Sequence, residues 1–229
     1  MRQPATVLAS LLVSASIIGG SVGSVAAVSQ AVPASALAHQ ETLYQEDVAS
    51  VWVPTYVQQR NLSCEYAAAV IAMAAYGVWV NEYDFDGMVG WSENPHWGYR
   101  GNITGWWGNT EDYGVYASAL APAIRNFGFW ADEFYAQGDA SALTSRLDAG
   151  EPVIVWLGLW GDTSFYEWTE DGTRYKLASG MHVVVAYAYD SGGVWVSDPA
   201  TGSKHFYDWG SYMTFWNVMD GMGLAVGPQ

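Results

Sequence analysis

The sequence predicts an α+β domain in which a buried helix packs on an antiparallel sheet. Residues 64–76 contain no Gly or Pro and, apart from Glu65, only apolar, small or aromatic residues, as expected for a helix that is buried on all sides. The apolar run at 180–189 is followed by the turn sequence Asp-Ser-Gly-Gly and then by residues 194–199. This order is typical of a core β-hairpin.

Residues 1–38 are expected to be a secretory signal and not part of the fold. Arg2 is followed by a long run without Asp, Glu, Lys or Arg, and Ala-Leu-Ala at 36–38 is a small-residue processing site. Cleavage after Ala26 or Ala27 is an alternative. An uncleaved membrane anchor is a second alternative, although glycine and serine make the run only weakly apolar. We therefore expect a secreted, extracellular protein in which residues 39–50 form a short linker.

Residues 51–229 are expected to form one domain. This segment is long enough to bury one hydrophobic core, and no repeat, charge run or low-complexity tract divides it. The leader carries one Arg and no acid, so the mature chain has seven Lys and Arg against 23 Asp and Glu, a net charge of about −16. This balance argues against nucleic acid and anionic membranes as partners.

Periodicity and capping signals predict the other elements. In chain order we expect an edge strand or extended segment at 51–57, the helix that begins at Cys64, a short helix at 81–89, a helix at 114–127, a strand at 130–135, a helix at 139–149 and a strand at 153–157. Residues 91–113 and 158–177 are expected to be loops. The first is long and rich in Trp and Gly, which is typical of a loop that shapes a site.

Cys64 is the only cysteine, so no internal disulfide can form. A lone thiol in a secreted protein is unusual, and a buried structural cysteine is the competing interpretation. At the start of a helix, free backbone N–H groups and the helix dipole lower the pKa of a thiol. We therefore expect a thiolate at Cys64, with the Glu65 side chain pointing away to solvent.

His182 and Asp198 stand at the entry and the exit of the predicted hairpin, so they are expected to lie close together. Their separation of 16 is even, so an odd number of loop residues places them on one face and an even number requires a bulge. A histidine held by a carboxylate stays basic, as a thiol nucleophile requires. The alternatives are a satisfied core histidine at position 182 and His205, in a predicted outer strand, as the base.

Three motifs occur together: Gln58 ahead of Leu62-Ser63-Cys64, Gly-Met-His-Val-Val-Val at 180–185, and Val-Trp-Val-Ser-Asp-Pro at 194–199. As a set they resemble the C39-like cysteine peptidases of the exported stand-alone type. The resemblance spans about residues 51–202. It implies the papain-like fold, in which a central N-terminal helix carrying the Cys packs on an antiparallel sheet carrying the His and Asp.

The resemblance also implies a role for each residue. Cys64 would be the nucleophile, His182 the general base and then acid, and Asp198 the group that orients His182. Gln58 would help to bind the oxyanion. The sequence departs from many relatives directly after the Cys, where they have Gly and Pro and this chain has a charged residue, Glu65.

These roles predict a secreted cysteine hydrolase, a peptidase that acts through a thioester acyl-enzyme on a peptide or protein substrate. An acyl transferase is a variant of this chemistry. We expect a monomer with no cofactor and no metal, since residues 84–87 carry only part of a calcium loop. The alternative is a non-catalytic exported module that binds peptide or cell-surface polymer through the Trp-rich loop, although packing beneath that loop is the expected place for most of its tryptophans.

Overall fold

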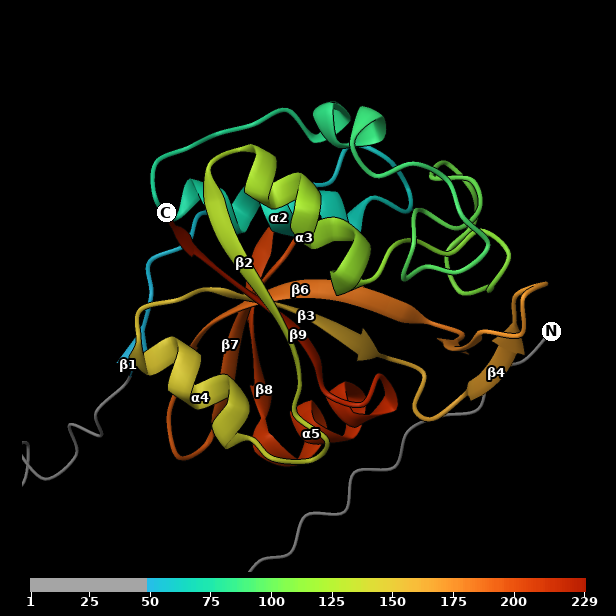
Figure 1. Cartoon of the computed structure of the whole chain (residues 1–229). Helices are drawn as coiled ribbons and strands as arrows, with labels where there is room; N and C mark the ends of the chain where they lie inside the picture. The colour runs from blue at the N-terminus through green and yellow to red at the C-terminus, as the bar shows by residue number, and fades with distance from the viewer. Residues whose placement is uncertain (1–48) are drawn as a thin grey trace, which may run out of the picture. The chain divides into compact units, whose positions relative to one another are not determined.

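The computed structural model describes residues 49–229. The predicted signal segment and most of the predicted linker lie outside the described residues. Residues 49–229 form three layers, in which one antiparallel sheet is covered by helices on both faces (Figure 1). The α+β fold that the sequence predicts is confirmed.

The sheet is antiparallel at every described strand pair, in the order β2-β9-β3-β6-β7-β8, and β1 pairs with part of β6. Its strands are β1 Ala49–Ser50, β2 Phe129–Tyr135, β3 Val153–Gly158, β6 Met181–Tyr189, β7 Gly193–Asp198, β8 Ser203–Asp208 and β9 Met222–Pro228. The central strands β3 and β6 are almost entirely buried because helices cover both of their faces. The predicted hairpin at 180–199 is the pair β6–β7.

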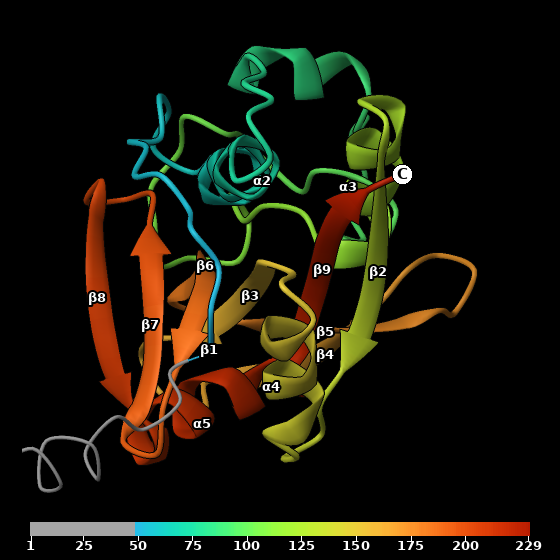
Figure 2. The ribbon, with the colours of Figure 1, turned by 90° about the vertical axis from the view of Figure 1, so that its left-hand side faces the viewer.

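Helices α2 (Cys64–Ala74) and α3 (Ala117–Asn126) lie on one face of the sheet, and α4 (Ser141–Asp148) and α5 (Trp209–Val218) lie on the other (Figure 2). Successive strand residues point to opposite faces. Val183 and Val185 therefore pack with α2, whereas Val184 and Ala186 belong to the core that includes α5. Every residue of α2 is buried, as its composition predicts.

Two parts of the chain differ from the prediction. The expected loop at 158–177 contains a hairpin of β4 (Ser164–Trp168) and β5 (Arg174–Ala178). A 3-10 helix, η1 (Glu82–Gly87), replaces the short helix expected at 81–89. Of the two alternatives for residues 51–57, the edge strand is not formed.

The C-terminal strand β9 is absent from the prediction although it lies inside the sheet. It is rich in glycine, a residue that strands usually avoid. At Gly223 and Gly227 an added Cβ would lie 2.5 and 2.3 Å from the rings of Phe134 and Trp130 on β2. The glycines thus make room for the aromatic side chains of the neighbouring strand.

Candidate functional site

Cys64 lies where the first turn of α2 meets the beginning of β6. A pocket of about 320 Å³ opens there and brings together residues from five separate parts of the chain. It is lined by Gln58, Asn61, Cys64, Trp107, Leu159, His182, Asp198 and Ala200. All four residues to which the sequence assigns a catalytic role therefore face one pocket, and His205 does not line it.

His182 and Asp198 are hydrogen-bonded, with 2.7 Å between Nε2 and Oδ1. Four residues, 190–193, separate the paired residues Tyr189 and Val194, and the register shifts between Ala186 and Ala188. An even loop combined with a bulge is one of the two arrangements that place both side chains on the same face. The expected proximity of His182 and Asp198 is confirmed.

Asp198 is a buried carboxylate whose Oδ1 also accepts a hydrogen bond from the Ala200 N–H (2.8 Å). Burial by itself would raise its pKa, but the hydrogen bond with His182 and the other donors hold the pKa below its usual value. An ionised Asp198 accepts a hydrogen bond from the Nε2–H of the neutral His182 ring. In this tautomer Nδ1 carries no hydrogen, so its lone pair can serve as a base.

His205 lies behind this pair, on β8. Its Nε2 is 3.8 Å from the second oxygen of Asp198 and 2.9 Å from the Thr201 hydroxyl. Its side chain is 41 % exposed, compared with 8 % for His182. This position favours His182 over His205 as the base that faces Cys64.

The thiol of Cys64 does not have the electrostatic surroundings that its helix position predicts. Burial raises its pKa well above the usual value, the Glu65 carboxylate raises it further, and the Val183 N–H acts in the opposite direction. Within residues 49–229, the hydrogen bond of Sγ is with Oε2 of Glu65, at 3.5 Å, and none joins it to the His182 ring. These shifts oppose the thiolate expected in the resting protein, because burial and the Glu65 carboxylate both favour the neutral thiol.

The expectation that Glu65 points to solvent is wrong. Its side chain is fully buried, and its second oxygen, Oε1, accepts the Val115 N–H at 3.0 Å. Burial raises the pKa of Glu65 to about 7, although backbone N–H groups lower it in part. Sequence reasoning missed this residue as part of the site. The available signal was a single charge in an otherwise apolar helix.

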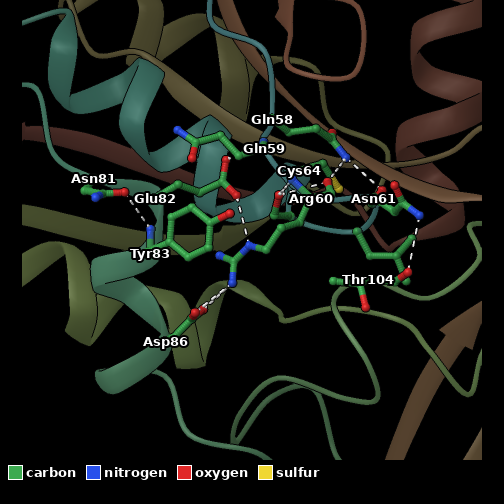
Figure 3. Close-up of polar contacts among 12 residues, drawn as sticks. Gln58, Gln59, Arg60, Asn61, Cys64, Asn81, Glu82, Tyr83, Asp86 and Thr104 are labelled. Atoms are coloured by element: carbon green, nitrogen blue, oxygen red, sulfur yellow. Dashed lines mark hydrogen bonds and ion pairs between the residues drawn. The ribbon is translucent and has the colours of Figure 1, made fainter.

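Gln58 precedes α2 in a short loop and lies close to Cys64 (Figure 3). Its Nε2 donates to the backbone carbonyls of Arg60 and Asn61, both at 2.8 Å, while its Oε1 is buried without a partner. Both N–H groups of the amide are thus in use within the loop. The structure places Gln58 at the site, but in the resting state its amide hydrogens face the loop backbone.

Arg60 fixes this loop to η1, as Figure 3 shows. Its Nε is 3.3 Å from Oε1 of Glu82, its Nη1 is 2.7 Å from Oδ2 of Asp86, and its guanidinium lies over the Tyr83 ring at 4.4 Å. Oε2 of Glu82 accepts the Gln59 N–H. A buried ion pair therefore anchors the segment that carries Gln58, a function that the spacing of these residues in the sequence does not reveal.

Tryptophans form one wall of the site. Trp107 donates its indole N–H to the Met181 carbonyl (2.7 Å), one residue before His182, and packs edge-on against Trp160 with 5.1 Å between ring centroids. Trp106 is 85 % exposed and lines a second hollow of about 440 Å³, which shares Gln58 and Trp107 with the first. The expectation that the tryptophans pack beneath the loop is wrong for Trp106 and for the exposed Trp91 and Trp97.

His96, a residue of the long loop, does not line the pocket; it packs against Tyr116 and hydrogen-bonds Ser118. The described part of the chain contains no group of three or more His, Cys, Asp or Glu side chains arranged to hold a metal. No helix in residues 49–229 has the length and apolar character needed to cross a bilayer.

Comparison with solved structures shows the same fold in a protein from Bacillus anthracis. That protein, described as a C39-like peptidase, superposes with a TM-score of 0.65 at 19 % identity, covering 79 % of this chain and 96 % of that one. The peptidase domain of Streptococcus ComA, a bifunctional ABC transporter, has a TM-score of 0.48 at 14 % identity, with coverage of 77 % and 98 %. A double glycine motif protease from an AMS/PCAT transporter has a TM-score of 0.49 at 16 % identity, and the superposition covers 79 % of this chain and 94 % of that one.

The sequence itself gives a more specific result. No curated protein matches the chain. The model of the family described as "Peptidase_C39 like family", however, matches residues 51–224, a range that contains the Cys64 helix, the β6–β7 hairpin and the whole pocket between them. On this match, the chain is a member of the Peptidase_C39 like family.

Proposed function

We propose that this protein is an exported cysteine peptidase in which Cys64, His182 and Asp198 form a catalytic triad. The observation that carries the proposal is the pocket itself, which is lined both by a thiol at the start of a helix and by a histidine whose Nε2 lies 2.7 Å from a carboxylate oxygen. A nucleophile, a base and a group that orients the base are the parts that covalent acyl transfer needs. A purely structural site has no need of all three.

The reaction begins when Nδ1 of His182 takes the proton from Sγ of Cys64. The thiolate attacks the scissile carbonyl, and the tetrahedral intermediate collapses to a thioester as the imidazolium protonates the leaving amine. Water, deprotonated by the same imidazole, then releases the acid product. Asp198 keeps the proton on Nε2 of His182 and stabilises the imidazolium during both steps.

Gln58 is the side chain proposed to stabilise the oxyanion, since its amide lies in the same pocket. To donate to an oxyanion it must release one of the carbonyls that it holds in the resting loop, that of Arg60 or Asn61. The first-turn N–H groups of α2, which have no partner within the helix, supply further donors. The ion pair of Arg60 and Glu82 keeps the loop in place during this exchange.

The proposed substrate is a peptide or protein, bound in extended form by a monomeric enzyme. The two hollows adjoin each other, since Gln58, Asn61, Trp107 and Ala200 line both of them. The exposed ring of Trp106, which lines the second hollow, offers broad apolar contact to side chains of the substrate. Residues 51–229 are proposed to be the peptidase domain, without cofactor or metal.

The experiment that tests the proposal is incubation of the mature protein with a mixed peptide library, in parallel with Cys64→Ala. Cleavage products that appear with the wild type and not with Cys64→Ala are expected. Cleavage by both proteins would point to a contaminating protease. If neither cleaves and the wild type retains peptides or a cell-surface polymer, the chain is the binding module that its exposed tryptophans also permit.

Export is proposed from the uncharged N-terminal run that precedes the domain. The mature chain should begin near His39 and be recovered outside the cytoplasm. N-terminal sequencing of the exported material checks this. Recovery of the full-length chain only in the cytosol would contradict it.

A further inference from the structure

Glu65 is a fully buried carboxyl group in direct contact with the proposed nucleophile, and the mechanism above does not use it. Oε2 lies 3.5 Å from Sγ of Cys64, and Oε1 accepts the Val115 N–H at 3.0 Å. The carboxyl is seated against Gly114, where an added Cβ would lie 1.9 Å from Oε1. Both oxygens thus have defined partners, and the backbone leaves room for this side chain.

No cation balances the charge of this carboxyl in the described residues, because none of the ion pairs there includes Glu65. The titratable groups that interact with it or with the thiol come from several surrounding elements. They are Cys64 and Tyr66 of α2, Glu82 of η1, Tyr99 and Tyr113 of the long loop, Tyr116 before α3 and Asp198 of β7. His182 of β6 lines the same pocket as Cys64. The tyrosines are neutral at physiological pH, since burial raises their pKa values further. An ionised Glu65 is therefore an unpaired buried charge, which is costly.

We propose that Glu65 is a positioning residue that acts through Cys64: the thiolate forms readily only while the Glu65 carboxyl carries a proton. The inference rests on the proposed function, because it assigns to Glu65 control over the nucleophile of that same site.

The protonation state of Glu65 controls where the Cys64 proton can go. With Glu65 protonated, the Cys64 proton passes from Sγ to Nδ1 of His182, and the carboxyl keeps its own proton and donates it in a hydrogen bond to the new thiolate. With Glu65 ionised, the same transfer would leave two anions about 3.5 Å apart in a buried site, and the thiol instead donates its S–H to Oε2. Burial raises the pKa of Glu65 to about 7, so the change between these two states falls near neutral pH.

The test is the rate of Cys64 alkylation by iodoacetamide as a function of pH, for the wild type and Glu65→Gln. Glutamine keeps the size of the side chain, still accepts the Val115 N–H, and can donate an N–H to the thiolate at any pH. We expect similar rates near pH 5.5 and a rate about tenfold or more higher for Glu65→Gln at pH 8, since each unit of thiol pKa is a factor of ten. Glu170→Gln, an exposed position with the same change, is the control and should follow the wild type.

A ratio of the two rates that is the same at both pH values would overturn the inference, because a merely structural effect of the substitution has no reason to follow the titration of Glu65. Labelling needs no substrate, so the result is separable from the proposed function. A protein that cleaves no peptide but shows the pH-dependent ratio retains the Glu65 mechanism and loses the peptidase assignment.

A second measurement uses the wild type and does not depend on how Glu65→Gln folds. Infrared spectroscopy should detect the C=O stretch of a protonated carboxyl at pH 5.5, its loss by pH 8.5, and a shift of the band in Cys64→Ala. Absence of the band at pH 5.5 would show that Glu65 is already ionised and would overturn the inference.

Discussion

Two buried carboxylates contact the proposed catalytic side chains, Glu65 the thiol of Cys64 and Asp198 the ring of His182, and their surroundings move their pKa values in opposite directions. Asp198 is paired with His182 and accepts a backbone N–H, so its pKa lies below the usual range. Glu65 has one backbone donor, a thiol and no cation, and its pKa rises to about 7. The difference shows that burial alone does not set the charge of a carboxyl group, because the partners decide whether the ionised form is tolerated.

The largest effect on turnover is expected when the proposed nucleophile or the proposed base is removed. Cys64→Ala and His182→Ala should each lower kcat for peptide hydrolysis by about 10³-fold or more, because no nucleophile or no base remains. Turnover of a peptide identified from the library, measured with each variant, checks this. Near-normal turnover in His182→Ala would mean that His182 is not the base, and Asp198 would then have no base to orient.

The next largest effect on turnover is expected for Asp198→Asn, which changes the partner that orients His182 but leaves the imidazole in place. Asp198→Asn should lower kcat by about 10- to 100-fold, less than His182→Ala does, because an asparagine oxygen can still accept the Nε2–H of His182. The fold should be unchanged, as judged by circular dichroism. Equal losses in the two variants would mean that Asp198 does more than hold the imidazole.

Stability should respond to pH with opposite signs at the two carboxylates. The raised pKa of Glu65 contributes stability that is present below its unfolded value, 4.5, and is lost as the pH rises through about 7. Glu65→Gln should therefore gain up to about 3 kcal/mol in unfolding free energy relative to the wild type between pH 4.5 and pH 8. The lowered pKa of Asp198 contributes stability that is present above its unfolded value and is lost as the pH falls through the folded one.

Urea denaturation of the wild type, Glu65→Gln and Asp198→Asn at acidic and mildly alkaline pH measures both effects. Asp198→Asn should be destabilised at pH 8 and less so at acid pH, the reverse of the trend for Glu65→Gln. Parallel curves for all three proteins would contradict the difference between the two sites.

The smallest effect is expected at His205. It is partly exposed and 3.8 Å from Asp198, so His205→Gln should change kcat by less than about threefold at pH 6 and pH 8. Steady-state kinetics at the two pH values provide the measurement. A loss as large as that of His182→Ala would make His205 the base.

Much of the fold could be predicted from the sequence because the relevant signals are local. The uninterrupted apolar run after Cys64 predicts a buried helix, and the run that begins at Gly180, with its turn residues, predicts the β6–β7 hairpin. The C-terminal strand β9 could not be predicted in this way. Its glycines are favourable only because Phe134 and Trp130 of β2 occupy the space that their side chains would fill.

For the candidate site, too, some features could be predicted from the sequence and others could not. Residue types and strand parity were enough to predict which chemical groups are available, namely one thiol, a histidine and an aspartate at the ends of a hairpin, and Gln58 ahead of the helix. The protonation of Cys64 and Glu65 could not be predicted in this way. It depends on desolvation by elements distant in the chain and, for Glu65, on the Val115 N–H, 50 residues away.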